Sequence, residues 1–535
     1  MTLKIHTEDL PADTAEPASS NAAPSSAIAD PSTPALNPKI DRRYVTAALM
    51  LVMVLASMEM MIASTAMPTI IGDLHGLEHY SWVTSVFLLM STVSMPLYGR
   101  LADAWGRKRV VLWAIAIFCA ASVLAASAQS LTQLIIFRGL QGLGAGGIMP
   151  VVLTILGDIF TLEERARIQG FFSTVWGTAA LAGPAVGALL VESLGWRSIF
   201  YVNVPLGAIS FGVLAWKYHD HGKPHNTNLD LPGVGLLAVA CSVTLLLVSS
   251  MGLEWMTLPV IAALLVIGVV SFALFVQVER KAENPILPPS LIANPAIGPP
   301  LLASALMGIA FFSIDTYVPL YVQGTTGAGP KAAAGVITPI MLAWAASGVF
   351  AAPIIVRWGF RKTAITGSCL SSIGLCSLFV CALLGASGWV LGTVLFVTGV
   401  GFGGASMPFL LSAQHGVGWQ QRGIVTSANQ FFRTMGGAIG IGLLGMLFNV
   451  LAAPQMQQLR DLGYKPAAIM DPHTAGTFPA EVQQVIRSMI EHGLTWVFLA
   501  MAIVACCQIF FALRMPRDND RMTAEDKIDL EPLHA

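Results

Sequence analysis

The chain has 535 residues, of which 55% are hydrophobic and only 11% are charged. Soluble proteins carry charges on roughly a quarter of their residues, so this composition excludes an ordinary soluble enzyme and favours a protein that crosses a membrane many times. The formal net charge of −1 gives no sign of a nucleic-acid partner. The seven cysteines lie in apolar stretches without metal-ligand spacing, so we expect neither a metal site nor a disulfide framework.

Both ends of the chain differ in composition from the middle. Residues 1–40 are rich in Ala, Pro and Ser and contain no apolar run, which predicts a disordered tail without a cleavable signal peptide. We place the boundary of this tail at 1–43. The stretch 515–535 is polar and charged and predicts a second tail.

Between the tails, fourteen apolar stretches are long enough to cross a bilayer, whose core requires about 20 apolar residues in a helix. The predicted membrane-spanning helices, in chain order, are 44–67, 82–99, 110–128, 132–157, 169–191, 198–215, 232–250, 258–278, 299–323, 332–356, 363–384, 389–412, 424–449 and 493–513. An all-α polytopic membrane protein is therefore expected.

The distribution of positive charge orients these helices. With the N-terminus inside, most of the 29 lysines and arginines fall on the inner side. The exceptions in outer loops are Arg197, Lys331, Arg460, Lys465 and Arg487. Because cytoplasmic loops are enriched in Lys and Arg, we predict a multi-pass protein of the cytoplasmic membrane with both termini in the cytoplasm.

The loop after the second span recurs after the tenth. A shift of 253 residues matches four positions, pairing Trp105 with Trp358, Gly106 with Gly359, Lys108 with Arg361, and Arg109 with Lys362. A glycine with basic residues can recur in any inner loop, but the position within each half agrees as well. The sequence thus predicts two six-helix halves, 44–216 and 299–514, and a two-helix insert, 217–298. Two parallel halves around a central cavity are a transporter architecture.

Four charged residues lie inside predicted spans: Glu59, Arg138, Asp315 and Arg433. An ionisable side chain inside a bilayer is costly and normally faces a cavity or a partner. Glu59 and Asp315 are 256 residues apart, close to the repeat shift, and each lies about 22–24 Å along its helix. They are near-equivalent carboxylates, one in each half.

We predict that Glu59 carries a coupling proton. Burial favours the protonated carboxyl, and a nearby Arg138 at comparable depth favours the carboxylate, so the group is poised between the two. Asp315 is the second candidate, either as a proton carrier or as a counter-charge for a cationic substrate. Arg433 either braces the thirteenth span or takes part directly.

Five segments resemble one known family. They are MEMMIASTAMPTI from Met58, GRLADAWGRKR from Gly99, FRGLQGLGAGG from Phe137, GPAVGALL from Gly183 and WRSIFYVNVPLG from Trp196. With them, residues 44–515 resemble the major facilitator superfamily, in particular its fourteen-span drug:proton antiporter branch. The sequence departs from the family pattern at Glu59, where Asp is usual, at Ser64, where Asn is usual, and at Ala179 and Ala188, where Gly is usual.

The resemblance implies two gating elements. The loop motif would latch the inner ends of neighbouring helices through Gly99, Asp103, Gly106, Arg107, Lys108, Arg109 and Asp158. The antiporter motif would form a gate between the halves through Gly183, Pro184 and Gly187, opposite MGGAIGIGLLG from Met435 in the other half. The alternatives are plain charge anchoring for the loop motif and close helix packing for the glycines.

The expected function is proton-coupled export of lipophilic or amphipathic compounds, with small-molecule substrates, protons and the lipid bilayer as partners. No GxxxxGK[ST] phosphate loop occurs, so we expect neither direct use of ATP nor a cofactor. No HExxH occurs, and no GxSxG has a plausible base, so we expect no enzyme. Alternatives are a dedicated exporter of one metabolite or antibiotic and, more remotely, a non-transporting membrane sensor.

Two further features leave their roles open. Aromatic and methionine side chains are plentiful and suit an adaptable apolar pocket, for which Trp82, Trp176 and Trp344 are candidates. The predicted outer loop 450–492 is long for such a connection. It would either fold over the exit or contact an adaptor protein on the outer side.

Overall fold

The computed structural model describes residues 41–74, 80–160, 164, 168, 183, 186–187, 189–220, 230–250, 256–282, 285–326, 330–418, 421–462 and 479–516. Residues from Pro38 onward form one compact unit. The described part consists of helices and short connections and contains no β-strand. The predicted all-α architecture is therefore confirmed.

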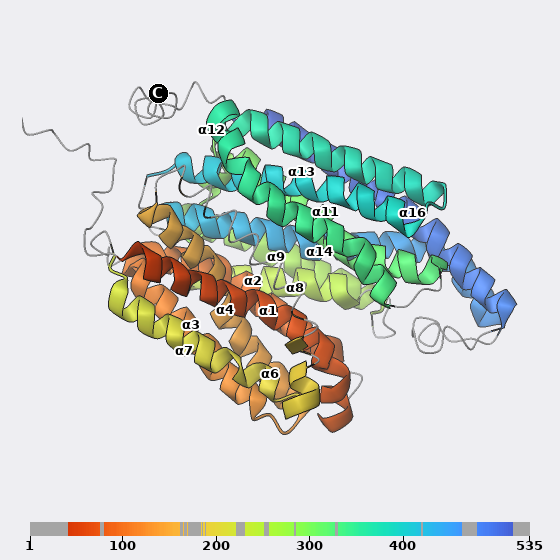
Figure 1. Cartoon of the computed structure of the whole chain (residues 1–535), viewed down its shortest axis with the longest axis horizontal. Helices are drawn as coiled ribbons and strands as arrows, with labels where there is room; N and C mark the ends of the chain where they lie inside the picture. The colour runs from red at the N-terminus through yellow and green to blue at the C-terminus, as the bar shows by residue number, and fades with distance from the viewer. Residues whose placement is uncertain are drawn as a thin grey trace, which may run out of the picture. The chain divides into compact units, whose positions relative to one another are not determined.

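The first half is a set of helices that pack mainly on one another (Figure 1). They are α1 (Arg42–Leu74), α2 (Tyr80–Trp105), α3 (Arg107–Ala126), α4 (Leu131–Ile159), α6 (Ser198–Tyr201) and α7 (Asn203–Lys217). The predicted span 198–215 is broken by a turn at Val202 into α6 and α7. Most of the predicted span 169–191 lies outside the described residues.

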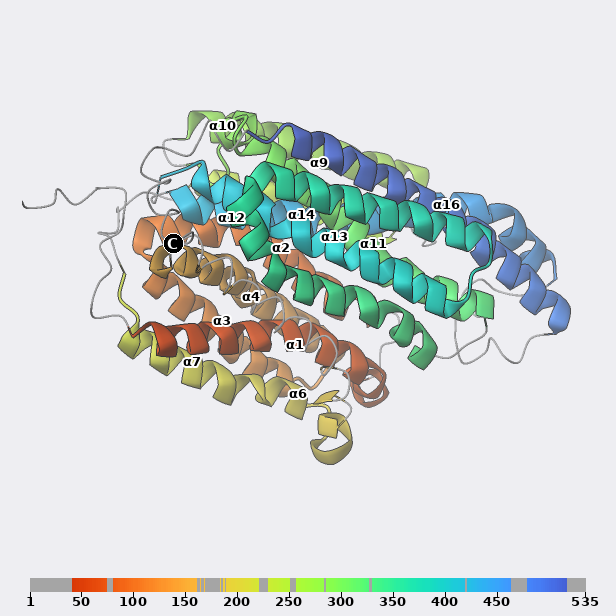
Figure 2. The ribbon, with the colours of Figure 1, turned by 45° about the horizontal axis from the view of Figure 1, so that its top comes forward.

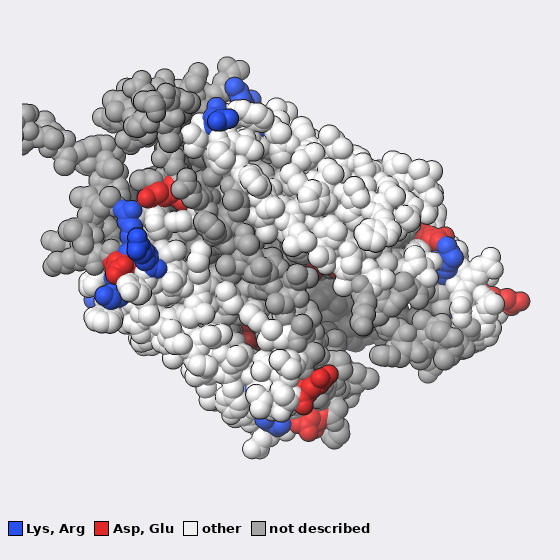
Figure 3. All heavy atoms as spheres, viewed as in Figure 1, with Lys and Arg blue, Asp and Glu red and all other residues white. Residues whose placement is uncertain are grey.

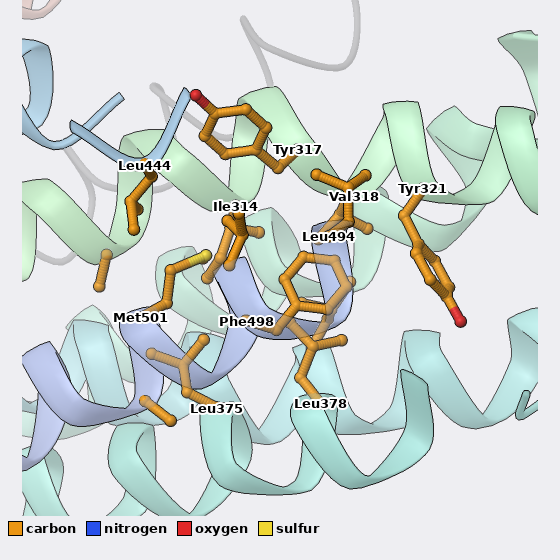
Figure 4. Packing of buried hydrophobic residues seen from close by; sticks show 14 of the residues in the cluster. Ile314, Tyr317, Val318, Tyr321, Leu375, Leu378, Leu444, Leu494, Phe498 and Met501 are labelled. Carbon is orange, nitrogen blue, oxygen red and sulfur yellow. The ribbon is translucent and has the colours of Figure 1, made fainter. Parts of the chain in front are cut away.

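The second half contains α11 (Gly298–Thr326), α12 (Pro330–Leu383), α13 (Gly388–His415), α14 (Arg422–Asp461) and α16 (Ala480–Leu513). Its core is an apolar cluster to which all five of these helices contribute, and Figure 4 shows part of it. In that cluster Ile314, Leu375, Leu494 and Phe498 are fully buried. The side chains of α16 thus fill the space between α11 and α12.

The insert contains α8 (Leu231–Ser250), α9 (Leu258–Lys281) and the short α10 (Pro289–Ala293), which was not predicted. The helix α8 packs on α9, on α14 of the second half and on α2 of the first half (Figure 1). In Figure 2, α9 and α10 lie at the top of the view, and α6 and α7 of the first half lie at the bottom. Leu237 and Phe275 of the insert share one apolar cluster with Val93 of α2 and Ile424 of α14. The insert therefore covers the contact between α2 and α14.

Glycines with the same backbone conformation lie at matching positions of the predicted internal repeat. Gly106 (φ 94°) separates α2 from α3, and Gly359 (φ 78°) bends α12 between the predicted spans 332–356 and 363–384. Positive φ favours glycine because a side chain at Cβ would clash with the backbone. The same two-helix break therefore occurs 253 residues apart.

A second glycine repeat links α4 and α13, which read GLGAGG from Gly142 and GVGFGG from Gly399. A Cβ atom at Gly144 would lie 2.6 Å from the backbone nitrogen of Phe118. A Cβ atom at Gly401 would collide in the same way with the backbone nitrogen of Ser371, 253 residues after Phe118. The two halves therefore use the same close helix contact, and this sequence signal was missed.

Ten helices among the described residues are long and apolar enough to cross a membrane, and Pro232–Leu247 and Ala332–Gly348 are shorter apolar helices. Most charged side chains on the face in Figure 3 lie toward its ends, and the described surface between them carries few charges. This is the pattern of a multi-pass membrane protein. The count of fourteen spans stays a prediction.

The predicted loop 450–492 is largely helical. The helix α14 continues to Asp461, and α16 begins at Ala480, so helix occupies both ends of that range. Only residues 463–478 lie outside the described part. The connection is therefore shorter than predicted, because both helices extend beyond their apolar segments.

Candidate functional site

A buried polar network in the first half contains Glu59, the predicted proton carrier. Arg138 of α4 donates from Nη1 to Glu59 Oε1 of α1 at 2.5 Å. Asn203, at the start of α7, donates from Nδ2 to Glu59 Oε2. The three side chains come from three helices and belong to residues that are at most 4% exposed. The structure thus brings Glu59 and Arg138 together and adds Asn203.

The network continues from Arg138 into the half. Arg138 Nη1 donates to Gln141 Oε1 at 2.7 Å, and Gln141 Nε2 donates to Ser122 Oγ at 2.9 Å. The Arg138 guanidinium also lies 4.2 Å from the ring centroid of Phe87, a favourable place for a cation. Ser122 and Asn203 were not among the predicted site residues, although Asn203 lies in the WRSIFYVNVPLG segment.

The loop motif forms a second cluster, where the ends of α2, α3 and α4 meet. Arg107 joins Asp103 at 3.1 Å and Asp158 at 3.0 Å, and the three side chains are 1–4% exposed. One buried guanidinium thus holds two carboxylates from different helices. We refer to this side of the molecule as the loop-motif end.

Asp103 also reaches the other half. Its carboxylate accepts hydrogen bonds from the backbone N–H groups of Gly423, at 3.3 Å, and Ile424, at 2.9 Å, in the first turn of α14. A helix N-terminus presents unpaired N–H groups and a partial positive charge, so a carboxylate is favourable there. Arg422 donates to the Gly157 carbonyl oxygen at 3.4 Å. The loop motif therefore joins the two halves.

Close packing supports this junction. A Cβ atom at Gly99 would collide with Ser427 of α14, so only glycine allows α2 and α14 to approach this closely. Within the first half, Asp220 Oδ1 accepts from the Lys108 N–H at 2.9 Å and caps α3. Lys108 is half-buried and Arg109 is exposed.

Tyr218, just after α7, lies fully buried beside this cluster. Burial raises the pKa of the Tyr218 phenol well above its ordinary value, with the charges of Asp158 and Asp220 acting in the same direction. The phenol therefore stays neutral among charged neighbours. Tyr218, Asp220 and Arg422 were not predicted, because their places depend on contacts between distant segments.

A cavity lies between the halves, with about 1000 Å³ of empty space including its opening. Its described lining comes from α1, α4 and α11–α14, and consists of Met53, Met149, Leu153, Phe311, Phe312, Met341, Trp344, Ala345, Gly348, Gly403, Ser406, Met407, Leu410, Asn429, Gln430 and Arg433. Two predicted residues, Trp344 and Arg433, belong to it. The cavity is mainly apolar, with its polar side chains on α13 and α14.

The remaining predicted residues lie elsewhere. Trp82 is 38% exposed and outside the described lining, and Trp176 and Pro184 lie outside the described residues. Gly183 and Gly187 are buried and helical. Asp315 is exposed on α11. It follows Phe311 and Phe312 by four and three residues, so it shares their helix face one turn beyond the cavity lining.

The glycines after Met435 bring α14 close to α11. A Cβ atom at Gly436 would collide with the Ala305 carbonyl oxygen, and one at Gly440 would lie 2.7 Å from the Ile309 side chain. The structure therefore shows close packing at this segment. Pairing with the antiporter motif stays a prediction.

Comparison with known proteins identifies the family. The pattern of the Major Facilitator Superfamily matches residues 49–441. The multidrug transporter protein MdtP of Bacillus subtilis (strain 168) is 36% identical over 414 residues, which cover 76% of this chain and 75% of that protein. Multidrug resistance protein 3 of the same strain is 27% identical over 501 residues, covering 90% of this chain and 97% of that protein.

A solved structure shows the same fold. The human organic anion transporter MFSD10 superposes with a TM-score of 0.58 at 13% identity, covering 88% of this chain and 99% of that one. The family pattern spans most of this chain, and the helical halves and the loop motif agree with it. The chain belongs to the Major Facilitator Superfamily, and it is a multi-pass membrane transporter.

Proposed function

We propose that this transporter is a proton-coupled antiporter that exports lipophilic or amphipathic compounds across the cytoplasmic membrane. The observation that carries the proposal is the position of Glu59. Its carboxylate is fully buried, held by Arg138 and Asn203, and outside the described lining of the cavity. Multidrug relatives at 36% and 27% identity support the class of compound.

Protonation of Glu59 would change the packing of three helices at once. The neutral carboxyl no longer compensates the Arg138 cation, which then depends on Gln141 and the face of Phe87. Since α1, α4 and α7 each contribute one member of the network, the protonated and ionised forms favour different arrangements of the first half. Coupling arises because proton and substrate bias the same change of access.

The loop motif would hold one of these access states. With Asp103 bound to the N-terminus of α14, the two halves are joined at the loop-motif end. We propose that this contact forms in one access state and breaks in the other. Asp315, exposed one turn beyond the cavity lining, remains the second candidate for the proton or for a counter-charge to a cationic substrate.

Transport in inside-out vesicles tests the proposal. An acid-inside gradient is imposed, a panel of cationic, neutral and anionic amphiphiles is added, and dissipation of the gradient is followed by a fluorescent dye. Wild type and the control Glu192→Gln, an exposed carboxylate outside the network, should dissipate the gradient with several compounds. Glu59→Gln should not, and Asp315→Asn should show a reduced response.

Two outcomes would count against the proposal. Full substrate-dependent dissipation by Glu59→Gln would remove the carboxylate from the coupling step. A wild-type protein that is folded but silent across the whole panel would favour a dedicated exporter of one compound instead.

A further inference from the structure

The cavity between the halves contains a cation without a protein counter-charge among the described residues. Arg433 lies 11 residues into α14, roughly 16 Å from its start, and lines the cavity. Its Nε is buried and has no hydrogen-bond partner within the described part of the chain. None of the ion pairs formed by described residues includes Arg433.

The other arginine inside the predicted spans shows what such a cation normally receives. Arg138 has a carboxylate, an amide oxygen and an aromatic face around its guanidinium. Arginine keeps its charge in proteins, and an uncompensated charge away from water is costly. The described residues therefore leave the charge of Arg433 open to a partner that comes from outside them.

Close helix packing fixes the backbone that carries Arg433. A Cβ atom at Gly308 of α11 would collide with the Arg433 carbonyl oxygen, and one at Gly437 would collide with the ring of Phe312. The backbone of α14 cannot shift toward α11 at this level. The Arg433 side chain therefore extends into the cavity from a backbone segment that close packing holds in place.

The rest of the described lining is suited to the apolar part of a ligand. The Phe311 ring packs edge-on against Trp344, with centroids 4.3 Å apart. Met149, Met341 and Met407 add flexible thioethers that adapt to different shapes. No carboxylate occurs in the described lining, so no negatively charged side chain there would pair with a cation.

Polar groups gather on the same helix as Arg433. Gln430 and Asn429 also line the cavity, and Asn429 Nδ2 donates to Ser304 Oγ at 2.8 Å, which fixes its amide. Gln430 precedes Arg433 by three residues and lies on the same face of α14. A cation with a neighbouring amide matches a carboxylate group in geometry and charge.

We propose that the cavity binds an amphipathic organic anion. The apolar or aromatic body lies among the Met, Phe and Trp side chains, and a carboxylate-type head pairs with Arg433 and hydrogen-bonds to Gln430. This inference rests on the proposed function in taking the cavity as the place of the exported compound. Among lipophilic and amphipathic compounds, it predicts that the transporter prefers anions to cations.

Binding to the purified full-length protein in detergent tests the inference without any proton gradient. Three probes share one aromatic body: 2-naphthylacetate, neutral 2-naphthylacetamide and (2-naphthylmethyl)trimethylammonium. Wild type should bind the acetate about tenfold or more tightly than the amide, since charge-assisted hydrogen bonds are lost with the amide. The ammonium probe should bind more weakly than either.

Variants assign the preference to Arg433. Arg433→Gln should bind acetate and amide alike, with amide affinity unchanged as the sign of a folded cavity. Arg433→Lys should keep a preference for the acetate. Arg197→Gln, at an exposed arginine paired with Asp73 outside the described lining, should match wild type.

The inference is overturned if wild type binds acetate and amide equally, if the ammonium probe binds best, or if Arg433→Gln keeps the acetate preference. If Arg433→Gln loses all binding, the probe preferences of wild type and Arg433→Lys test the inference instead. An Arg433→Lys variant without a preference for the acetate would then contradict the inference. Glu59→Gln should bind the acetate normally. A failure of proton coupling is therefore distinguishable from a failure of anion binding.

Discussion

Two residues of the buried network have apolar counterparts in the second half. The glycine repeat aligns Arg138 with Leu395, and the 253-residue shift aligns Ser122 with Leu375. Both leucines are fully buried in the apolar cluster of the second half. The fold therefore does not require polar residues at these positions, and their presence in the first half points to function.

The Glu59–Arg138 pair predicts strongly non-additive effects on stability. Arg138→Met should lower the free energy of unfolding by about 3–5 kcal/mol, because it leaves a buried carboxylate without its cation. The double variant Glu59→Met with Arg138→Met should lose much less, since no charge remains buried. Thermal unfolding of Arg138→Met, Glu59→Met and the double variant in detergent measures these losses, and a loss in the double variant equal to the sum of the two single losses would show that the pair is not coupled.

The sequence allowed part of the site to be predicted. Charges inside apolar spans are visible from hydropathy alone, which is why Glu59, Arg138 and Arg433 were identified. The places of these side chains were not predictable to the same degree. For Arg433 the sequence left open whether the side chain braces its span or takes part directly. The structure places it in the cavity lining, and no sequence pattern indicated this, because the face a helix turns inward depends on its neighbours.

At the scale of helices, the two halves share the same close helix contacts but carry different side chains at matching positions. The Arg107–Asp158 ion pair of the first half corresponds to Phe360 and His415 in the second, whose rings lie 6.0 Å apart. The glycine contacts between α3 and α4 recur between α12 and α13. Both halves thus share one backbone arrangement, and among these positions only the first half carries the charged latch.

These glycine contacts predict intolerance to a single methyl group. Gly144→Ala would place Cβ against the backbone of Phe118 and should cost about 1–3 kcal/mol of stability. Gly401→Ala should cost a similar amount of stability, because its Cβ would meet the backbone of Ser371. Gly212→Ala on α7 is the matched control, because no atom lies within 4 Å of its Cβ position. Thermal unfolding of the three variants measures these changes in stability. A Gly144→Ala variant as stable as wild type would contradict the close contact.

Helix boundaries were less predictable than helix existence. Hydropathy locates the apolar segment that crosses a bilayer, but α14 and α16 continue as helices beyond it. The short helix α10 has only five residues, too few for a helical pattern of apolar residues to predict it from the sequence. The bond from Asp103 to α14 joins residues 321 apart, and no local pattern encodes such a contact.

At the scale of the whole molecule, the two halves meet through α14. It packs on α2 and α4 of the first half and on α8 of the insert, while its own half holds it through α11 and α16. Asp103 caps its first turn, and Arg433 lies further along it in the cavity. One helix therefore links the loop-motif end to the cavity between the halves.

Hydrogen exchange can measure the cap on α14 directly. Asp103→Ala should speed deuterium uptake in a peptide covering residues 421–430, because the Gly423 and Ile424 amides lose their acceptor. Asp230→Ala is the matched control, since Asp230 Oδ1 accepts from the Gly233 N–H in the first turn of α8. That variant should speed exchange at α8 alone. Unchanged uptake at α14 in Asp103→Ala would show that the contact does not hold the halves.

The central claim is that Glu59 couples the proton to transport without forming the substrate cavity. Substrate exchange between the two sides of proteoliposomes, at equal pH, needs the cavity and the change of access but no net proton movement. Glu59→Gln should therefore keep exchange of a labelled substrate close to wild type and lose accumulation driven by a pH gradient. Gradient-driven accumulation at the wild-type level in Glu59→Gln would contradict the claim.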